Sequence, residues 1–508
     1  MAVDTSMRQL PAERFDLAAA RHLLWRTGFG APWGEVRRVQ KLGVDNAVDE
    51  LIDRQLRSPA HHLRAQRAGG DEIPEPRIDP DTIRPPTPEE RRAYRRARRD
   101  GDEKLLARLE EMRRERRRTN RRDFVELQEW WLRRMAVGRR PLEENLTLFW
   151  HGHFATGFRE VNDAYLIYKQ HQTLRRFGAD NFARLARAIV RDPAMIRYLN
   201  NDRNHRRNPN ENLARELMEL FTLGEGQYRE RDIKEGARAL TGYGLDDNDF
   251  RFHQNRHDSG YKSILGSRGR YDGDDFVEVL LRRSACPQYI ALKLYDHFVA
   301  DVGDVAAEVP RDLVPAVKSL GVELARNRYA IRPTLRILFK SRHFYDPAVV
   351  GGKIKSPIQM LVGTTRSLGL PEREPRLVRR GLHVMGQVPF QPPSVDGWDG
   401  GRKWINTSTL FARQNVCAYL VTGDRRAKPE ADASFDPMSV LAAMPQADRK
   451  DPAKVANHCI DLMLGPDTPP QRRAPIVRFM KDRRLGVHRT SVTALLLVIT
   501  AAPEYQLC

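Results

Sequence analysis

Apolar residues recur three and four positions apart along most of the chain, and this spacing predicts helices. Residues 210–224 show it clearly, because Leu213 and Leu217 begin an apolar stripe that continues to the end of the segment. Asn210 follows a proline and would cap the first turn, and Gly224 stands where a glycine commonly ends a helix. Strand-like alternation is sparse. We therefore predict a mostly α, multi-helix globular fold.

Changes in composition divide the chain into three parts. Residues 1–65 predict a small N-terminal helical subdomain. Residues 66–122 begin with a Pro-rich linker and continue as an Arg-rich charged insertion. Residues 123–508 predict the main helical domain, in which polar site loops interrupt the helices. Residues 243–252 and 384–393 are predicted to be irregular, and such loops are common places for functional sites.

Charge is concentrated in residues 89–122, where few apolar residues interrupt a run of arginines and acids. A solvated helix is the default interpretation of such a run. A basic arm that binds nucleic acid or another acidic polymer is the alternative. Only Tyr94 stands as an aromatic among these arginines, so the pattern does not favour base stacking.

The whole chain carries a formal net charge of +20 over 508 residues, and arginine far outnumbers lysine. Its four cysteines form no CxxC pair, which argues against a zinc ribbon or a thioredoxin motif. The longest apolar run, 494–502, is shorter than the roughly 20 residues that a membrane span needs. The N-terminus shows no apolar export signal. We expect no transmembrane segment, and either cytoplasmic residence or export together with a partner.

The predicted helix at 210–224 is unusually acidic. Glu211 and Arg215 are four residues apart and share a face, as do Arg215 and Glu219. Glu216 and Glu219 are three apart and could converge on one cation. A solvent-facing ladder of ion pairs is the alternative interpretation.

Two histidines lie close together in an aromatic segment. His151 and His153 are separated by Gly152 and flanked by three aromatic residues. Residues two apart point in different directions on a regular helix, but a glycine at a helix end would let the imidazoles converge. This pattern indicates a metal or acid–base site, and a pair of packed core histidines is the alternative.

Two loops complete the set of polar segments. One holds His257, Asp258 and Lys262, which offer two acceptors and a cation, or are simply solvated. The other, 389–404, is rich in proline and glycine, and its Trp398 and Trp404 would line the floor of a pocket.

Common catalytic motifs are missing from the chain, namely GxSxG, HExxH, the Walker A motif and a correctly placed GxGxxG. Our leading hypothesis is a site for a divalent metal ion of unknown identity, serving hydrolysis or redox chemistry. Arg215 or Lys262 would neutralise a developing anion. The predicted metal ligands are His151, His153, Glu211, Glu216, Glu219, His257 and Asp258.

Seven blocks of the sequence, taken together and in order, resemble the bacterial domain of unknown function 1800 family. They are 22–30, 149–154, 210–224, 237–243, 257–266, 353–369 and 392–404. The resemblance implies a mostly helical domain without an established activity, often encoded beside proteins of the domain of unknown function 1501 family and often exported.

The chain departs from that family pattern in places. Gly152 stands where the family typically has Asn or Asp, and Tyr243 replaces a tryptophan. The export signal is missing, and the insertion at 89–122 is particular to this chain. A non-catalytic structural or interaction protein, partnering a domain of unknown function 1501 protein, is therefore the alternative to an enzyme. Substrate, reaction and oligomeric state are not set by the sequence.

Overall fold

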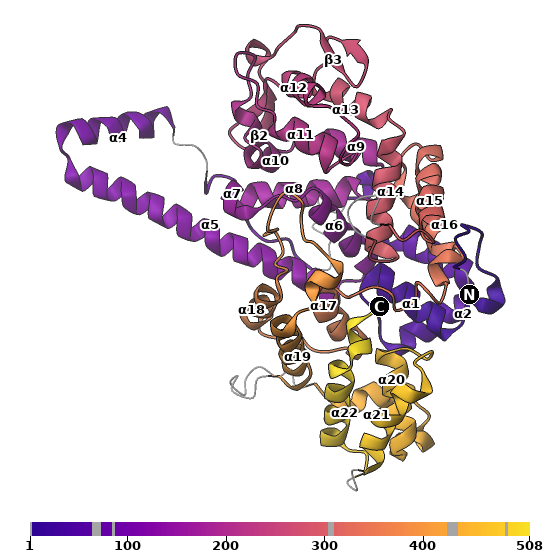
Figure 1. Ribbon diagram of the computed structural model, residues 1–508. Helices are drawn as coiled ribbons and strands as arrows, with labels where there is room; N and C mark the ends of the chain where they lie inside the picture. The colour runs from indigo at the N-terminus through magenta and orange to yellow at the C-terminus, as the bar shows by residue number, and fades with distance from the viewer. Residues whose placement is uncertain (1–2, 63–72, 84–86, 303–308, 424–434, 483–485) are drawn as a thin grey trace.

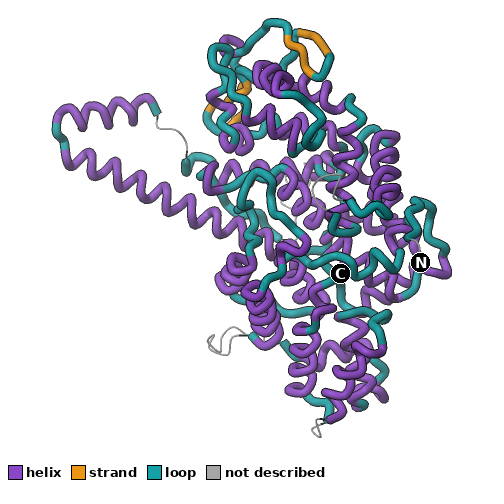
Figure 2. Tube along the Cα trace, in the orientation of Figure 1, coloured by secondary structure: helices purple, strands orange, loops and turns teal. Residues whose placement is uncertain are grey.

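The structure is a computed structural model that describes every residue except 1–2, 63–72, 84–86, 303–308, 424–434 and 483–485. The part of the Pro-rich linker at 66–72 and 84–86 therefore lies outside the described residues. Helices make up most of the described chain, as the purple tube in Figure 2 shows. The predicted mostly α fold is confirmed.

The N-terminal half and the centre of the chain form a first group of helices, of which α1, α8 and α14 pack against α6. The group consists of α1 (Leu17–Gly28), α2 (Trp33–Glu50), α6 (Pro141–His153), α7 (Phe158–Val161), α8 (Ala164–Phe177), α9 (Phe182–Ile189), α10 (Pro193–Tyr198), α11 (Asn212–Glu219), α12 (Glu230–Ala239), α13 (Gly273–Leu281), α14 (Ala285–Phe298), α15 (Val314–Arg326) and α16 (Ile331–Lys340).

The C-terminal helices form the lower part of the molecule in Figure 1. They are α17 (Pro357–Leu368), α18 (Pro375–Met385), α19 (Thr407–Thr422), α20 (Pro452–Met463), α21 (Pro470–Asp482) and α22 (Arg489–Ala501). Short turns link the helices: η1 (Ala12–Arg14), η2 (Leu51–Gln55), η3 (Asn201–Arg203), η4 (Gln254–Arg256), η5 (His343–Tyr345), η6 (Gly401–Trp404), η7 (Pro437–Ala443), η8 (Gln446–Lys450) and η9 (Pro503–Gln506).

Local sequence signals explain where many helices begin and end. At α17, the Ser356 side chain accepts a hydrogen bond from the backbone N–H of Gln359, and the Gln359 side chain returns the bond in a capping box. Pro357 occupies the first turn, where its missing N–H has no cost, and Gly369 ends the helix in the left-handed conformation.

The Arg-rich insertion is a helical arm that projects from the body (Figure 1). Helix α4 (Pro88–Asp100) turns at Gly101, whose φ is 66°, and α5 (Glu103–Val137) returns to the body. The charged segment and the apolar residues after Phe124 thus belong to one continuous helix. The boundary that the sequence suggested at residue 122 falls within α5.

Residues 243–252, which we predicted to be irregular, form a hairpin. Strand β1 (Tyr243–Asp246) pairs antiparallel with β2 (Asp249–Phe252), with Tyr243 opposite Phe252. Asp247 takes a φ of 53° in the turn, a conformation that aspartate tolerates better than most residues. A second hairpin pairs β3 (Lys262–Ile264) with β4 (Ser267–Gly269). Both strand pairs are small and lie beside α11–α13.

Helix α6 lies in the middle of the core and is buried along nearly its whole length. Its acidic first turn is held by buried arginines: Arg134 Nε lies 2.9 Å from a carboxylate oxygen of Glu144, and an Arg175 amino group lies 2.8 Å from one of Glu143. Breaking such a buried pair would leave an uncompensated charge, so the network holds α6 in position. No described helix is long and apolar enough to span a membrane.

Candidate functional site

The histidine segment and the acidic helix, which are far apart in the sequence, meet in the structure. Helix α6 ends at His153, whose Nε2 lies 3.1 Å from the main-chain oxygen of Phe221, just beyond α11. Since a carbonyl oxygen only accepts, Nε2 carries the proton and donates it. This leaves Nδ1 of His153 as the acceptor of a neutral imidazole.

A cavity of about 350 Å³ opens where these two segments meet. Its walls come from the end of α6, the end of α11, one face of α14, and the segments 353–359 and 387–404. Carboxylates, imidazoles, amines and indoles line it together: Glu219, Glu225, Asp296, Asp396, Asp399, His153, His297, Lys293, Lys353, Trp398 and Trp404. The prediction that Trp398 and Trp404 line a pocket is confirmed.

One glycine, Gly397, allows the loop 387–404 to approach α6 closely. Gly397 has a φ of 86°, and a Cβ placed there would lie 2.4 Å from the main-chain oxygen of Gly152. Only glycine allows this approach without a backbone shift. The next residue, Trp398, has a buried indole N–H that no described residue accepts. A buried donor without an acceptor is costly in protein interiors, so it marks a place for a ligand or water.

Glu216 lies next to the cavity but is not one of its lining residues. Partial burial, and then the negative charges of Glu219 and Asp396, raise the pKa of Glu216 to about 7, while Arg215 opposes the shift. Glu219 accepts a hydrogen bond from the hydroxyl of Tyr228. The carboxyl of Glu216 therefore exchanges a proton near neutral pH.

The imidazoles at the pocket are neutral. Burial lowers the pKa of His153 to about 3, with a smaller effect from Lys293, and burial likewise lowers that of His297 to about 3. Nε2 of His297 lies 3.0 Å from the amide oxygen of Asn145, while the amide nitrogen of Asn145 donates to the main-chain oxygens of Arg26 and Thr27. His297 therefore donates through Nε2, and its Nδ1 is an acceptor.

His151 lies outside the cavity and holds the loop 387–404 that forms one of its walls. Its Nε2 accepts a hydrogen bond of 3.0 Å from the backbone N–H of Phe390, and its ring packs against Trp131, Phe390 and Trp398. Burial lowers the pKa of His151 to about 3. The two histidines therefore do not face one ligand: His153 lines the cavity and His151 holds the loop.

Glu211 and Arg215 lie on the outer face of α11. One amino group of Arg215 lies 3.2 Å from Glu211 and 2.8 Å from Glu230 at the start of α12. These pairs match the ion-pair ladder that was the alternative interpretation of this helix. Neither side chain lines the cavity.

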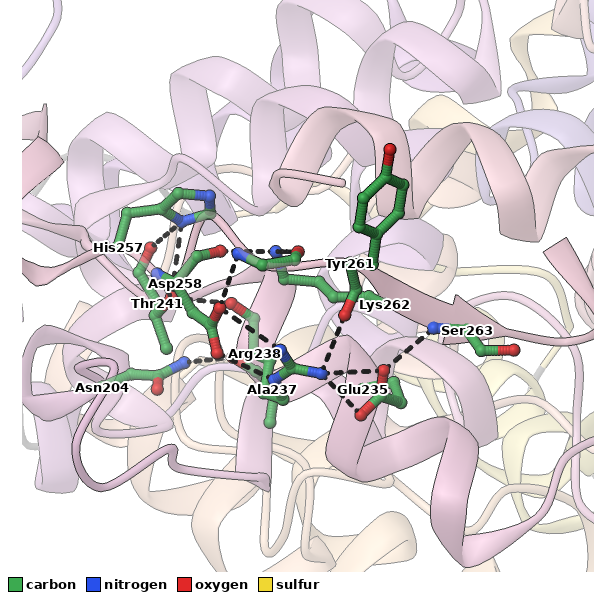
Figure 3. Close-up of polar contacts among 11 residues, drawn as sticks. Asn204, Glu235, Ala237, Arg238, Thr241, His257, Asp258, Tyr261, Lys262 and Ser263 are labelled. Carbon is green, nitrogen blue, oxygen red and sulfur yellow. Dashed lines mark hydrogen bonds and ion pairs between the residues drawn. The ribbon is translucent and has the colours of Figure 1, made fainter. Parts of the chain in front are cut away.

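His257, Asp258 and Lys262 form a separate polar network around Arg238 (Figure 3). Arg238 Nε lies 2.8 Å from Asp258, and its Nη1 lies 2.9 Å from Glu235. The ammonium of Lys262 donates to the main-chain oxygens of Asp258 and Gly260, and Nδ1 of His257 donates to that of Thr241 over 2.8 Å. The network ties the hairpin loop to α12, and none of its members lines the cavity.

Of the predicted metal ligands, only His153 and Glu219 line the pocket. His151 and Glu216 lie behind or beside it, Glu211 lies on the outer face at the start of α11, and His257 and Asp258 belong to the Arg238 network. Among the described residues, no group of three or more His, Cys, Asp or Glu side chains is positioned to hold a metal ion.

Comparison with known proteins gives a family for the chain. The family model described as "Protein of unknown function (DUF1800)" matches residues 22–507. The chain belongs to this family. A search of the curated proteins and a search of the solved structures found no match. The resemblance seen in the sequence is confirmed, and the match spans every element that lines the pocket of this DUF1800 protein.

Helix α14 contributes residues to the DUF1800 pocket that sequence reasoning missed. Tyr289, Lys293, Asp296 and His297 are spaced at i, i+4, i+7 and i+8, which places them on one side of the helix. Polar side chains at this spacing, inside a helix that is otherwise apolar, could have been recognised in the sequence as candidate pocket residues. Asp396 and Asp399 were within a segment that we selected, but only its tryptophans were given a role.

Proposed function

We propose that this DUF1800 protein is a hydrolase whose active site is the pocket between α6, α11, α14 and the loop 387–404. The observation that carries the proposal is the raised pKa of Glu216, a carboxyl that shares a half-buried site with Glu219 and Asp396. A carboxyl that titrates near neutral pH beside other carboxylates is typical of acid–base catalysis.

The carboxyl groups would act as general acid and general base in hydrolysis. Glu216, with its raised pKa, would donate a proton to the leaving group, and Glu219 or Asp396 would accept a proton from the attacking water. Trp398 would donate its unpaired indole N–H to the substrate, and Trp404 would offer an apolar surface for stacking. Carboxylates next to aromatic surfaces favour hydrolysis over redox chemistry for this pocket.

The sequence offered two cations to stabilise a developing anion, and neither lines the cavity. Arg215 lowers the pKa of Glu216 from the outer face of α11, and so adjusts the acid without entering the cavity. Lys262 remains a prediction from the sequence, but it belongs to the Arg238 network. We propose Lys293 in this role instead, because it lines the cavity.

A divalent metal ion remains a prediction from the sequence. Asp258 is engaged by Arg238 and Glu211 by Arg215, and no three of the described acidic and imidazole side chains are positioned to hold one ion. Metal analysis of purified protein, with and without chelator, tests this prediction: a stoichiometric ion lost in Glu216→Gln and Glu219→Gln supports it, and no bound ion removes it.

The hydrolase is tested with a panel of 4-nitrophenyl esters, phosphates and glycosides. We expect the wild-type protein to hydrolyse at least one class, and Glu216→Gln to lose most of that activity with an unchanged circular dichroism spectrum. Glu115→Gln on the arm, which removes an exposed carboxylate far from the pocket, serves as the control. A protein inert toward the whole panel, or a Glu216→Gln variant as active as wild type, would contradict the proposal.

An interaction protein remains the alternative, and one surface supports it. Val384 on α18 and Leu410 and Phe411 on α19 are exposed apolar side chains on neighbouring helices, and Phe411 is 73% exposed. Large exposed apolar groups often mark protein interfaces. We propose this surface as the place where a domain of unknown function 1501 protein would bind. Co-purification that Phe411→Ser abolishes would support the partnership, and co-purification insensitive to it would exclude this surface.

The arm supports binding to an acidic polymer such as nucleic acid. Arg91, Arg95 and Arg98 are exposed along one side of α4, and none forms an ion pair with a described residue. Changing these three arginines to glutamine should weaken binding to duplex DNA and reduce its salt dependence. Arg116→Gln, in which the arginine is already paired with Glu90, is the matched control.

A further inference from the structure

A second cavity lies at the base of the arm, separate from the pocket of the proposed hydrolase. It measures about 680 Å³ and is bounded by α5, α17, the start of α18 and the segment 73–77. None of its lining residues also lines the first pocket. Its volume falls within the range of roughly 300–1,000 Å³ that is typical of small-molecule sites.

The walls of this cavity are mainly apolar and conformationally restricted. Trp130, Leu361, Leu420 and Val378 contribute apolar surface. Prolines on the segment 73–77 and at the start of α18 fix the backbone around them. A cavity with such walls is already formed before a ligand arrives, so little ordering opposes binding.

One donor in the wall has no acceptor. Trp130 is only 6% exposed, and its indole N–H is buried without a hydrogen-bond partner among the described residues. The ring itself is well held, since it packs against Tyr168 and His171 of α8 and lies under the guanidinium of Arg134. A fixed, unsatisfied donor in an apolar wall selects a ligand that brings an acceptor.

Most of the charged groups around this cavity have partners. Arg133 on α5 pairs with Glu372 at 2.7 Å, and Glu129 pairs with Arg379 at 3.3 Å. Arg373 donates to the main-chain oxygen of Leu420 over 2.8 and 2.9 Å. Arg77 and Glu126, of opposite charge, also line the cavity and are exposed to solvent. The buried part of the walls therefore offers no unbalanced charge to an ionic ligand.

We propose that this cavity binds an uncharged, elongated lipid-like molecule whose ester or hydroxyl oxygen accepts the hydrogen bond of Trp130. The apolar walls would hold the acyl chain. This site does not depend on the proposed hydrolase, because the two cavities share no residue and the ligand need not react.

Isothermal titration with monodecanoyl glycerol tests the proposal on the full chain, with decanoate as the charged counterpart. We expect saturable binding of one monodecanoyl glycerol per chain and at least about tenfold weaker binding of decanoate, because an unpaired carboxylate is costly in an apolar cavity. No saturable binding, or tighter binding of decanoate, would overturn the assignment.

Two valines provide a matched pair of variants. Val378→Trp would fill the cavity and abolish binding, whereas Val322→Trp places the same ring at an exposed position of α15 and should leave binding unchanged. Trp130→Phe, which removes the indole N–H together with part of the buried ring, should weaken binding about 2- to 10-fold. If Val378→Trp does not fold, Ala136→Trp fills the cavity from α5 instead. Equal effects of the blocking and control variants would show that the ligand binds elsewhere.

Discussion

The Nε2–H of His153 donates to the main-chain oxygen of Phe221 over 3.1 Å, and this bond joins the end of α6 to the end of the acidic helix. Both partners are buried, so the bond is shielded from water. It places an imidazole with a free acceptor nitrogen beside the carboxylates of α11. The pocket exists because these two segments, about 60 residues apart in the sequence, are fixed against each other.

His151 is expected to contribute to stability and not to chemistry. His151→Ala removes a buried ring and leaves the backbone N–H of Phe390 without its acceptor, which should lower the free energy of unfolding by about 2–4 kcal/mol. Urea denaturation measures the change. The exposed His383→Ala serves as the control and should differ little from wild type. A His151→Ala protein that is as stable as wild type but inactive would reverse this assignment.

Glu216 should make activity depend on pH near neutrality. The protonated carboxyl is the active form, so the rate should fall as the pH rises through about 7. Glu216→Gln should be inactive both below and above this pH.

The stability of the folded protein should also depend on the ionisation of Glu216. The folded state holds this proton more tightly than the unfolded one, so the free energy of unfolding should decline between about pH 4.5 and 7.

Glu216→Gln should remove that part of the decline when denaturation is repeated at several pH values. Activity that stays constant from pH 6 to 8 would show that Glu216 does not supply the essential proton.

Gly397 and Gly152 should respond in opposite ways to alanine. A Cβ at Gly397 meets the main-chain oxygen of Gly152 at 2.4 Å and requires a strained φ, so Gly397→Ala should destabilise the protein by about 1–3 kcal/mol and disturb the pocket. A Cβ at Gly152 finds only Trp398 at 4.0 Å, an ordinary contact. In a helix, Gly152→Ala should be neutral or stabilising by up to about 1 kcal/mol. Thermal unfolding compares the two, and equal effects would argue against the close approach.

Lys355 should add a pH dependence of stability with the opposite sign. It is fully buried, lies 3.8 Å from the centre of the Trp25 ring, and donates to the main-chain oxygen of Tyr505 over 2.7 Å. Burial lowers its pKa from 10.5 to about 7. The unfolded state therefore binds the proton more tightly between these values, and the free energy of unfolding should gain about 2–4 kcal/mol from pH 7 to 10.

Lys355→Met should lose this gain, measured as the difference from wild type at each pH. The exposed Lys318→Met should keep it. Parallel pH profiles for wild type and Lys355→Met would show that the amine stays charged in the folded protein.

The helical architecture was open to prediction because it depends on local patterns. The apolar stripe of 210–224 acts over a few turns and predicted α11, although the helix covers only Asn212–Glu219 and ends before Gly224. The hairpin at 243–252 was missed, because its turn depends on a single residue, Asp247, in a left-handed conformation that strand propensity does not reveal.

The candidate site was harder to predict from the sequence than the helical architecture. His153, Glu219 and the tryptophans of 389–404 were selected, and they do line one pocket. His257 and Asp258 were selected on the same grounds of residue type, yet Thr241 and Arg238 engage them elsewhere. A sequence shows which side chains are capable of acid–base chemistry, but not which of them an arginine already holds.

The sequence by itself determined that this chain is helical, basic and a member of the DUF1800 family. Periodicity, charge and the blocks typical of the family depend only on the order of residues in the chain. Tertiary structure alone decided which polar residues meet. Burial, and the approach of Glu216 to Glu219 and Asp396, shift a pKa only once distant segments are packed together. The same holds for Trp130 and Trp398, whose unpaired N–H groups arise from what surrounds them.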